Sequence, residues 1–196
     1  MAYSMITPNE KKVLRYLLAY HNVNSINQIA RSCQLSPNGA HKIFRKFEKE
    51  GMVTGSKIAN LISYKINFKS REAKKILEFI LLPTKDKKIQ FRYHDLAPLE
   101  KVTSLCILFG SYITTKEKPN DLDVLFVVEK KKYAAYHQLL EKVKLIVPLK
   151  IHDVVQTSLD LQKNIRVKEP FIVDILHKGI VLWGQESLIE VIGRVT

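Results

Sequence analysis

The sequence predicts a mixed α/β chain (α+β) that is divided into two domains. Apolar residues recur at helical spacing over about the first 50 residues, and the spacing then changes to the alternation of strands. Farther along, apolar strands alternate with amphipathic helices, as in a mixed sheet with flanking helices. We expect domains over residues 1–69 and 103–196, with connecting helices over 70–102. With 196 residues, 46% of them hydrophobic, the chain can form two small cores.

Three helices are expected at the start, each marked by a capping residue. Thr7-Pro8 and Ser36-Pro37 combine a capping hydroxyl with a proline suited to the first helical position, and Ser25 can cap a helix between them. The third helix should run to about Glu50, because Gly51 readily adopts the conformation that ends helices. Its outer face is polar and basic: Asn38, His41, Lys42, Arg45, Lys46 and Lys49.

A β-hairpin should follow these helices. Apolar and polar residues alternate from Ile62 to Phe68, so Ser63 falls on the polar face of a half-exposed strand. Its partner would be Met52–Lys57, with a turn near Ala59-Asn60. Three helices, a hairpin and a basic third helix resemble a winged helix-turn-helix domain over about residues 5–69. The resemblance implies that the third helix enters the major groove of duplex DNA and that the hairpin reaches the backbone or the minor groove.

The charge distribution agrees with DNA binding. Residues 1–70 hold 11 Lys and Arg against 3 Asp and Glu, and residues 71–196 hold 21 against 16, for a net charge of +13. Phosphate contacts would dominate the affinity and make it depend on salt. Protein docking by the winged helix and RNA binding are the alternatives. The expected phosphate contacts are Lys42, Arg45, Lys46, Lys49, Lys57 and Lys65, with Asn38, His41 and Arg45 placed to contact bases.

The rest of the chain predicts helices and apolar strands in turn. The helix over residues 71–82 is either a connector or the seam of a homodimer, and Pro83 separates it from a helix over 87–100. A helix over 131–145 should turn Tyr133, Tyr136, Leu140 and Val143 inward. The other expected elements are strands over 103–109, around Asp153 and over 178–184, with helices over 158–165 and 170–178.

Two motifs in the second domain indicate phosphate and metal chemistry. A Gly110-Ser111 turn leaves one apolar strand, and Asp121-Leu122-Asp123 opens the next. Residues two apart on a strand point to the same face, so the two carboxylates can converge on one or two hard cations. A Gly-Ser turn can offer backbone N–H groups and a hydroxyl to a phosphate. Together they predict a polyphosphate that is bound at one end by the turn and at the other through a metal ion.

This arrangement resembles the signature of polymerase-beta-like nucleotidyltransferases, and in particular the minimal, MNT-type branch, over about residues 87–184. The resemblance implies a nucleoside triphosphate, Mg²⁺ in a one- or two-metal site, and transfer of a nucleoside monophosphate to an acceptor hydroxyl. The acceptor would be a small molecule or a protein, such as a helical HEPN-type partner. Gly110 and Ser111 would contact the β and γ phosphates, and Asp121 and Asp123 would hold the metal.

The resemblance also implies a third carboxylate that ligates the second metal and activates the acceptor. Asp153 is the candidate, since it stands among apolar residues of a later strand, and Asp160 and Asp174 are alternatives. His152 would point to the opposite face from Asp153, so we expect it to pack within the domain.

One segment departs from the family pattern. Tyr112-Ile113-Thr114-Thr115 stands where many members have Tyr-Ala-Arg-Gly, so a phosphate-binding Arg is missing; Lys116 or Lys118 would have to supply that charge. The departure leaves two other functions open. In the first, the protein is a transcriptional regulator whose second domain only senses nucleotide or acts as a scaffold. In the second, it is a transferase that modifies RNA.

The remaining composition bears on the compartment. Cys33 and Cys106 lie far apart in apolar runs, which predicts reduced core residues of an intracellular protein. The chain has no apolar run of about 18 residues and no signal-peptide layout, so we expect a soluble, cytoplasmic protein.

Overall fold

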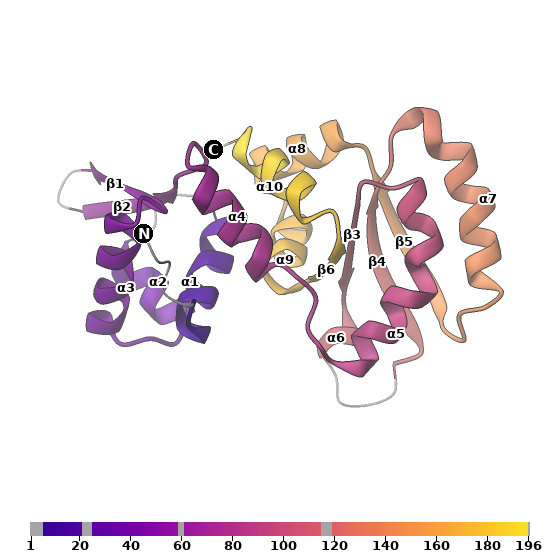
Figure 1. Ribbon diagram of the computed structural model, residues 1–196, viewed down its shortest axis with the longest axis horizontal. Helices are drawn as coiled ribbons and strands as arrows, with labels where there is room; N and C mark the ends of the chain where they lie inside the picture. The colour runs from indigo at the N-terminus through magenta and orange to yellow at the C-terminus, as the bar shows by residue number, and fades with distance from the viewer. Residues whose placement is uncertain (1–5, 21–24, 59–60, 115–118, 196) are drawn as a thin grey trace. The chain divides into compact units, whose positions relative to one another are not determined.

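The computed structural model describes residues 6–20, 25–58, 61–114 and 119–195. The chain forms two compact units, Met1–Ile80 and Leu81–Thr196. The mixed α/β architecture expected from the sequence is confirmed, with a hairpin in the first unit and a four-stranded sheet in the second (Figure 1). The helices predicted over residues 70–102 divide between the units, because the first belongs to unit 1 and the second to unit 2.

Unit 1 begins with three helices whose starts are set by side-chain caps. Thr7 and Glu10 form a reciprocal capping box, and Ser25 and Ser36 each accept a hydrogen bond from a backbone N–H in the first turn of their helix. These caps were expected, as was the end of the third helix at Gly51, which has a φ of +68°. The elements are α1 (Pro8–Ala19), α2 (Ile26–Ser32), α3 (Pro37–Lys49), β1 (Val53–Ile58), β2 (Leu61–Ile66) and α4 (Arg71–Ile80).

The hairpin packs on α3 through aromatic residues. β1 and β2 pair antiparallel, as predicted, and the expected turn at Ala59-Asn60 lies outside the described residues. Phe44 of α3 is fully buried and stacks on Tyr64 of β2 at a centroid distance of 4.5 Å. The placement of Ser63 on an exposed face was wrong. Ser63 is 1% exposed, because a bridge to Ser25 adds a third chain segment beside β2 at this point.

Unit 2 is built around a mixed sheet with the strand order β5-β4-β3-β6. β3 pairs antiparallel with β4 and β6, whereas β4 and β5 are parallel and are joined through the helix α7. Helices α5 and α7 cover one face, and α8, α9 and α10 cover the other (Figure 1). The strands are β3 (Leu105–Phe109), β4 (Asp121–Val127), β5 (Lys150–Gln156) and β6 (Ile180–Trp183). The helices are α5 (Lys87–Leu96), α6 (Ser111–Thr114), α7 (Tyr133–Lys144), α8 (Ser158–Val167), α9 (Pro170–Lys178) and α10 (Gln185–Gly193).

The core beneath α7 shows where the sequence pattern held and where it did not. Tyr136, Leu140 and Val143 are buried as predicted, but Tyr133 is 48% exposed. Tyr133 is the first residue of α7 and lies at the rim, so the prediction of an inward side chain was wrong. The helix expected over 87–100 ends at Leu96 and continues as a 3₁₀ helix over Ala97–Lys101, where proline removes an N–H donor.

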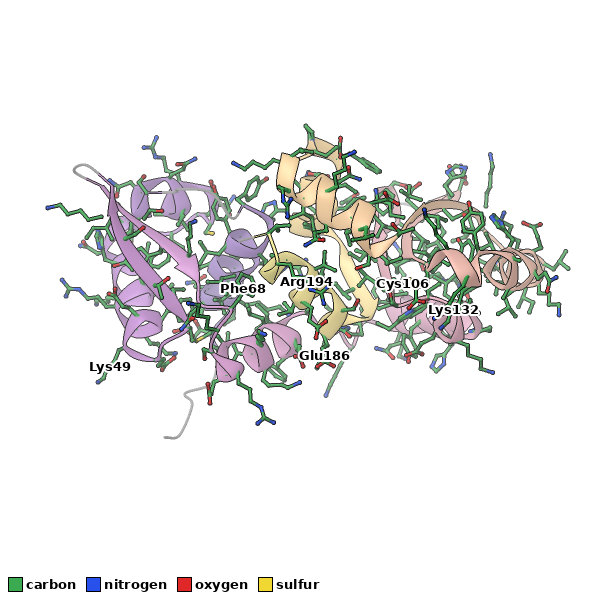
Figure 2. All side chains as sticks on the ribbon, turned by 90° about the horizontal axis from the view of Figure 1, so that it is seen from above. Lys49, Phe68, Cys106, Lys132, Glu186 and Arg194 are labelled. Carbon is green, nitrogen blue, oxygen red and sulfur yellow. The ribbon has the colours of Figure 1, made fainter. Side chains whose placement is uncertain are left out.

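Both cysteines are free thiols in buried positions, as expected of core residues. Cys106 lies in the interior of unit 2 (Figure 2). Among the helices that the structure describes, none combines the length and the apolar character needed to cross a bilayer.

Candidate functional site

The two motifs of unit 2 meet at one end of the sheet. β3 ends at Phe109, which pairs with Asp123 near the start of β4, and Gly110 and Ser111 follow at once (Figure 1). Asp121 and Asp123 are half-buried and lie on the same face of β4. The prediction that the Gly-Ser turn and the Asp pair come together therefore agrees with the geometry.

Gly110 is in direct contact with the Asp123 carboxylate. Its φ is +71°, and a Cβ built on it would overlap Asp123 Oδ2. Only glycine fits this close approach and this backbone conformation without strain. The carboxylate is thus held against the turn that would receive a phosphate.

His152 lies on the other side of the same carboxylate. The parallel register pairs Asp123 with His152, so both side chains lie on one face, and His152 Nδ1 is 3.5 Å from Asp123 Oδ1. His152 is 44% exposed and Asp123 is 26% exposed. The expectation that His152 packs within the domain was wrong.

Asp153 does not join the Asp pair. It is paired in register with Val124, on the opposite face of the sheet, under α7. There Tyr136 Oη donates a hydrogen bond of 2.9 Å to Asp153 Oδ2, and Lys144 Nζ lies 4.0 Å from Oδ1. Burial, and then the neighbouring carboxylate, raise the pKa of Tyr136 well above its ordinary value. Asp153 therefore links α7 to the sheet, and the residue predicted as the third carboxylate does not lie on the face of Asp121 and Asp123.

The two alternative carboxylates are also engaged elsewhere. Asp160 accepts hydrogen bonds from the Thr157 hydroxyl and backbone N–H in the capping box of α8. Asp174 pairs with Lys178 at 2.6 Å along α9. Neither carboxylate is part of the site formed by Gly110, Asp123 and His152.

The segment that departs from the family pattern has a structural role. Lys88 Nζ of α5 donates a hydrogen bond of 2.6 Å to the Tyr112 carbonyl oxygen and lies 4.4 Å from the centre of the Tyr112 ring. The Tyr112 hydroxyl donates back to the Lys88 carbonyl oxygen at 3.2 Å. These contacts hold the Gly-Ser turn to α5. The sequence did not reveal Lys88, because nothing local links it to a residue 24 positions away. The proposed substitutes Lys116 and Lys118, with Thr115, lie outside the described residues.

Lys150 is a second residue that sequence reasoning missed. It is exposed and pairs in register with Asp121, so it lies on the face that carries both carboxylates. A cation at this position can contact a phosphate that approaches the Asp pair. Only the strand register reveals this, because Lys150 is one of many lysines in the sequence.

The donors present fit a metal ion that also takes ligands from a bound phosphate. Within the described ranges, no three His, Cys, Asp or Glu side chains form a metal cluster of their own. Mg²⁺ and similar ions are commonly bound by one or two carboxylates together with substrate phosphates, without a closed protein cage. The carboxylates of Asp121 and Asp123 provide such an incomplete site.

A pocket of about 370 Å³ lies at the other end of β4 and β5. Its walls include Val128, Tyr133 and Val155, with Gln156 and Thr157 among its polar groups. Because these residues lie at or just beyond the carboxyl ends of β4 and β5, the pocket is separate from the Asp pair, which lies at the start of β4.

Most of the residues of unit 1 that were predicted to contact DNA are exposed. Lys46 is the exception, because its Nζ lies 2.7 Å from Glu10 Oε1 of α1. Burial opposes the charge on Glu10, but the hydrogen bonds from Lys46 and Thr7 hold its pKa below the ordinary value. Lys46 therefore ties α3 to α1, and its assignment as a phosphate contact stays a prediction. The exposed candidates are Asn38, His41, Lys42, Arg45, Lys49 and Lys57, with Lys65 half-buried; Lys49 projects from the end of α3 (Figure 2).

Comparisons with known proteins support the two units unequally. Residues 6–54, from α1 into β1, match a family model described as winged helix-turn-helix DNA-binding. Unit 1 contains a winged helix-turn-helix domain. Residues 88–179, which include the Gly-Ser turn, the Asp pair and His152, match a family of unknown function (DUF6932). No curated protein and no solved structure matches the chain. A DNA-binding role follows for the winged helix, and the chemistry of unit 2 rests on its geometry.

Proposed function

We propose that the protein binds DNA through its winged helix and binds a metal–nucleoside triphosphate at the Gly110–Asp123 site. One observation carries the second part. The Asp123 carboxylate turns one oxygen toward the Gly-Ser turn and the other toward His152, on the face that also carries Asp121. A metal ion held there lies beside backbone N–H groups suited to phosphate.

Each end of the ligand has a matching group. The N–H groups and hydroxyl of the Gly110-Ser111 turn are suited to the terminal phosphates, and the carboxylates of Asp121 and Asp123 to the metal ion that neutralises them. Lys150, in register with Asp121, adds a positive charge on the same face. The ring of Phe109 contacts Phe171 of α9 at a centroid distance of 5.5 Å, so an aromatic surface borders the site.

Nucleotide binding without chemistry is the function that this geometry supports best. A two-metal transfer needs a carboxylate beside the Asp pair to ligate the second ion and activate the acceptor. Asp153 lies on the opposite face of the sheet and accepts a hydrogen bond from the Tyr136 hydroxyl. Unit 2 then senses nucleotide for a DNA-binding regulator.

Nucleotidyl transfer is the second candidate, and the joined Gly-Ser turn and Asp pair favour it. In that reaction the oxygen of an acceptor hydroxyl bonds to the α-phosphorus, the bond to the bridging oxygen breaks, and pyrophosphate leaves. The proton of the hydroxyl passes to a base, for which His152 is the exposed group beside Asp123. The identity of the acceptor, for which a HEPN-type protein is one option, stays a prediction. The formation of a homodimer also stays a prediction.

Binding and turnover of labelled ATP, CTP, GTP and UTP separate the two candidates. The wild-type chain is compared with Asp121→Asn/Asp123→Asn in the presence of a divalent ion. Binding by wild type alone, without release of pyrophosphate, supports a sensor, whereas label transferred to protein or product establishes a transferase. Absence of nucleotide binding by wild type contradicts the proposal. The double variant should keep its DNA affinity, because the carboxylates lie in the other unit.

A further inference from the structure

We propose that His152 is a metal ligand and that the site takes a first-row transition-metal ion, such as Mn²⁺ or Co²⁺, in preference to Mg²⁺. This inference rests on the proposed function, in which the site binds a metal–nucleoside triphosphate. It adds the identity of one donor and the class of ion.

The separation of the two side chains suits a shared ion. Asp123 Oδ1 and His152 Nδ1 are 3.5 Å apart. Donors that bind one ion at about 2.0–2.2 Å lie about 3.0 Å apart in octahedral geometry and about 3.4 Å apart in tetrahedral geometry. An ion can therefore bind both groups with only a small movement of either side chain.

The register between β4 and β5 places His152, and not Asp153, beside Asp123 as a possible metal ligand. Asp123 and His152 are partners in the parallel register, whereas Asp153 is the partner of Val124 on the opposite face. Bringing Asp153 to the site would shift β5 by one residue, and every side chain of the strand would change face. Such a shift would also break the hydrogen bond between Tyr136 and Asp153 beneath α7.

The change of donor alters which ion is favoured. Mg²⁺ prefers oxygen ligands and binds largely through charge, so a neutral imidazole in place of a carboxylate weakens its site. Imidazole nitrogen is a good ligand for transition-metal ions, which accept mixed nitrogen and oxygen donors. Asp123 would supply an oxygen and His152 the nitrogen, and the other ligands would come from the phosphates and from water.

The test is nucleotide affinity with different ions. Binding of ATP, CTP, GTP and UTP to the full chain is measured by calorimetry in Mg²⁺, Mn²⁺ or Co²⁺, for wild type, His152→Asp and His152→Ala. We expect wild type to bind more tightly with Mn²⁺ or Co²⁺ than with Mg²⁺. His152→Asp, which makes the donors all oxygen, should shift the ratio of the dissociation constants toward Mg²⁺ by about tenfold. His152→Ala should lose the preference without gaining Mg²⁺ affinity.

A spectroscopic measurement identifies the ligand itself. Pulsed electron paramagnetic resonance of Mn²⁺ bound with nucleotide should detect coupling to an imidazole nitrogen in wild type and none in His152→Asp. The exposed His94, on α5, provides the matched control, and His94→Ala should behave as wild type. Circular dichroism checks that each variant is folded.

The outcomes separate this inference from the proposal beneath it. Nucleotide binding with the same ion ratio in wild type and His152→Asp overturns the role of His152 and leaves nucleotide binding intact. Failure of wild type to bind any of the four nucleotides with any of the three ions overturns both.

Discussion

In unit 1 Glu10, and in unit 2 Asp123, lies beside a nitrogen-bearing side chain of another element, and the two pairs differ in burial and distance. In unit 1, Glu10 is 7% exposed and lies 2.7 Å from Lys46 Nζ. In unit 2, Asp123 is 26% exposed and lies 3.5 Å from His152, which is 44% exposed. The first, closed pair is joined by a short hydrogen bond, whereas the second, open pair is more widely separated and more exposed. Similar groups thus hold helices together in one place and, in the function we propose, bind a ligand in another, and burial distinguishes the two pairs.

Gly110→Ala is expected to have the largest effect, because Gly110 lies against the Asp123 carboxylate of the open pair. The added Cβ would overlap the Asp123 carboxylate at a residue with a φ of +71°. We expect the free energy of unfolding to fall by about 2–4 kcal/mol, from the left-handed backbone and the overlap together, and nucleotide binding to be lost. Chemical denaturation and calorimetry measure the two effects.

Gly51→Ala is the matched control for backbone strain. Gly51 has a φ of +68°, but a Cβ there would meet nothing within 4 Å. Its loss of stability should be only about 1–2 kcal/mol, with nucleotide binding unchanged. Equal losses in the two variants would contradict the close packing of Gly110 on Asp123.

Lys46→Ala tests the closed pair. It leaves the Glu10 carboxylate in a mostly buried position without its cation, so the free energy of unfolding should fall by about 1–2 kcal/mol. Lys42, exposed on the same helix, is the control, and Lys42→Ala should change stability by less than about 0.5 kcal/mol. If thermal and chemical denaturation give the same stability for both variants, Lys46 has no structural role.

Acid should narrow the difference in stability between wild type and the Lys46→Ala variant. In the folded protein, hydrogen bonds hold the pKa of Glu10 below its ordinary value of 4.5. A lowered pKa contributes stability that is present above 4.5 and is lost as the pH falls through the folded value. Without Lys46 the pKa of Glu10 is no longer held as low, so the variant gains less stability from the ionised carboxylate and loses less of it in acid. Denaturation midpoints between about pH 3 and pH 6 measure this, and parallel curves would rule it out.

Tyr136→Phe should separate the structural carboxylate from the open pair. The variant loses the hydrogen bond to Asp153 and should be less stable by about 1 kcal/mol. Nucleotide affinity should stay within about twofold of wild type, because Asp153 faces away from the Asp pair. A large loss of nucleotide affinity, measured by calorimetry, would show that Asp153 contributes to nucleotide binding.

Lys42→Ala/Lys49→Ala should have the smallest effect on the fold and act only on DNA. Both side chains are exposed on α3, so stability should be unchanged. The slope of log affinity for duplex DNA against log salt should fall by about 2, one for each lost phosphate contact. Lys12→Ala, an exposed charge on α1, is the control and should keep the wild-type slope. Fluorescence anisotropy at several salt concentrations measures the slope, and an unchanged slope in the double variant would place the DNA contacts elsewhere.

Local patterns accounted for most of the secondary structure. The caps at Thr7, Ser25 and Ser36 start their helices as expected, since each satisfies N–H groups within its own first turn. The Gly110 turn and the alternate carboxylates of β4 were also predictable. They depend on the conformational freedom of glycine and on the two-residue period of a strand, and both properties are local.

Contacts between distant segments decided the rest. Lys46, which was predicted to contact DNA, pairs with Glu10, 36 residues away. His152, and not Asp153, shares the face of Asp123, because the alternation along β5 separates the two residues but does not say which one faces Asp123. That choice depends on the register of β5 against β4, which the packing of α7 and its hydrogen bond from Tyr136 to Asp153 support. The sequence alone determined which chemical groups are present and where elements begin, and the tertiary structure decided which groups meet, because register and burial are properties of packing between segments.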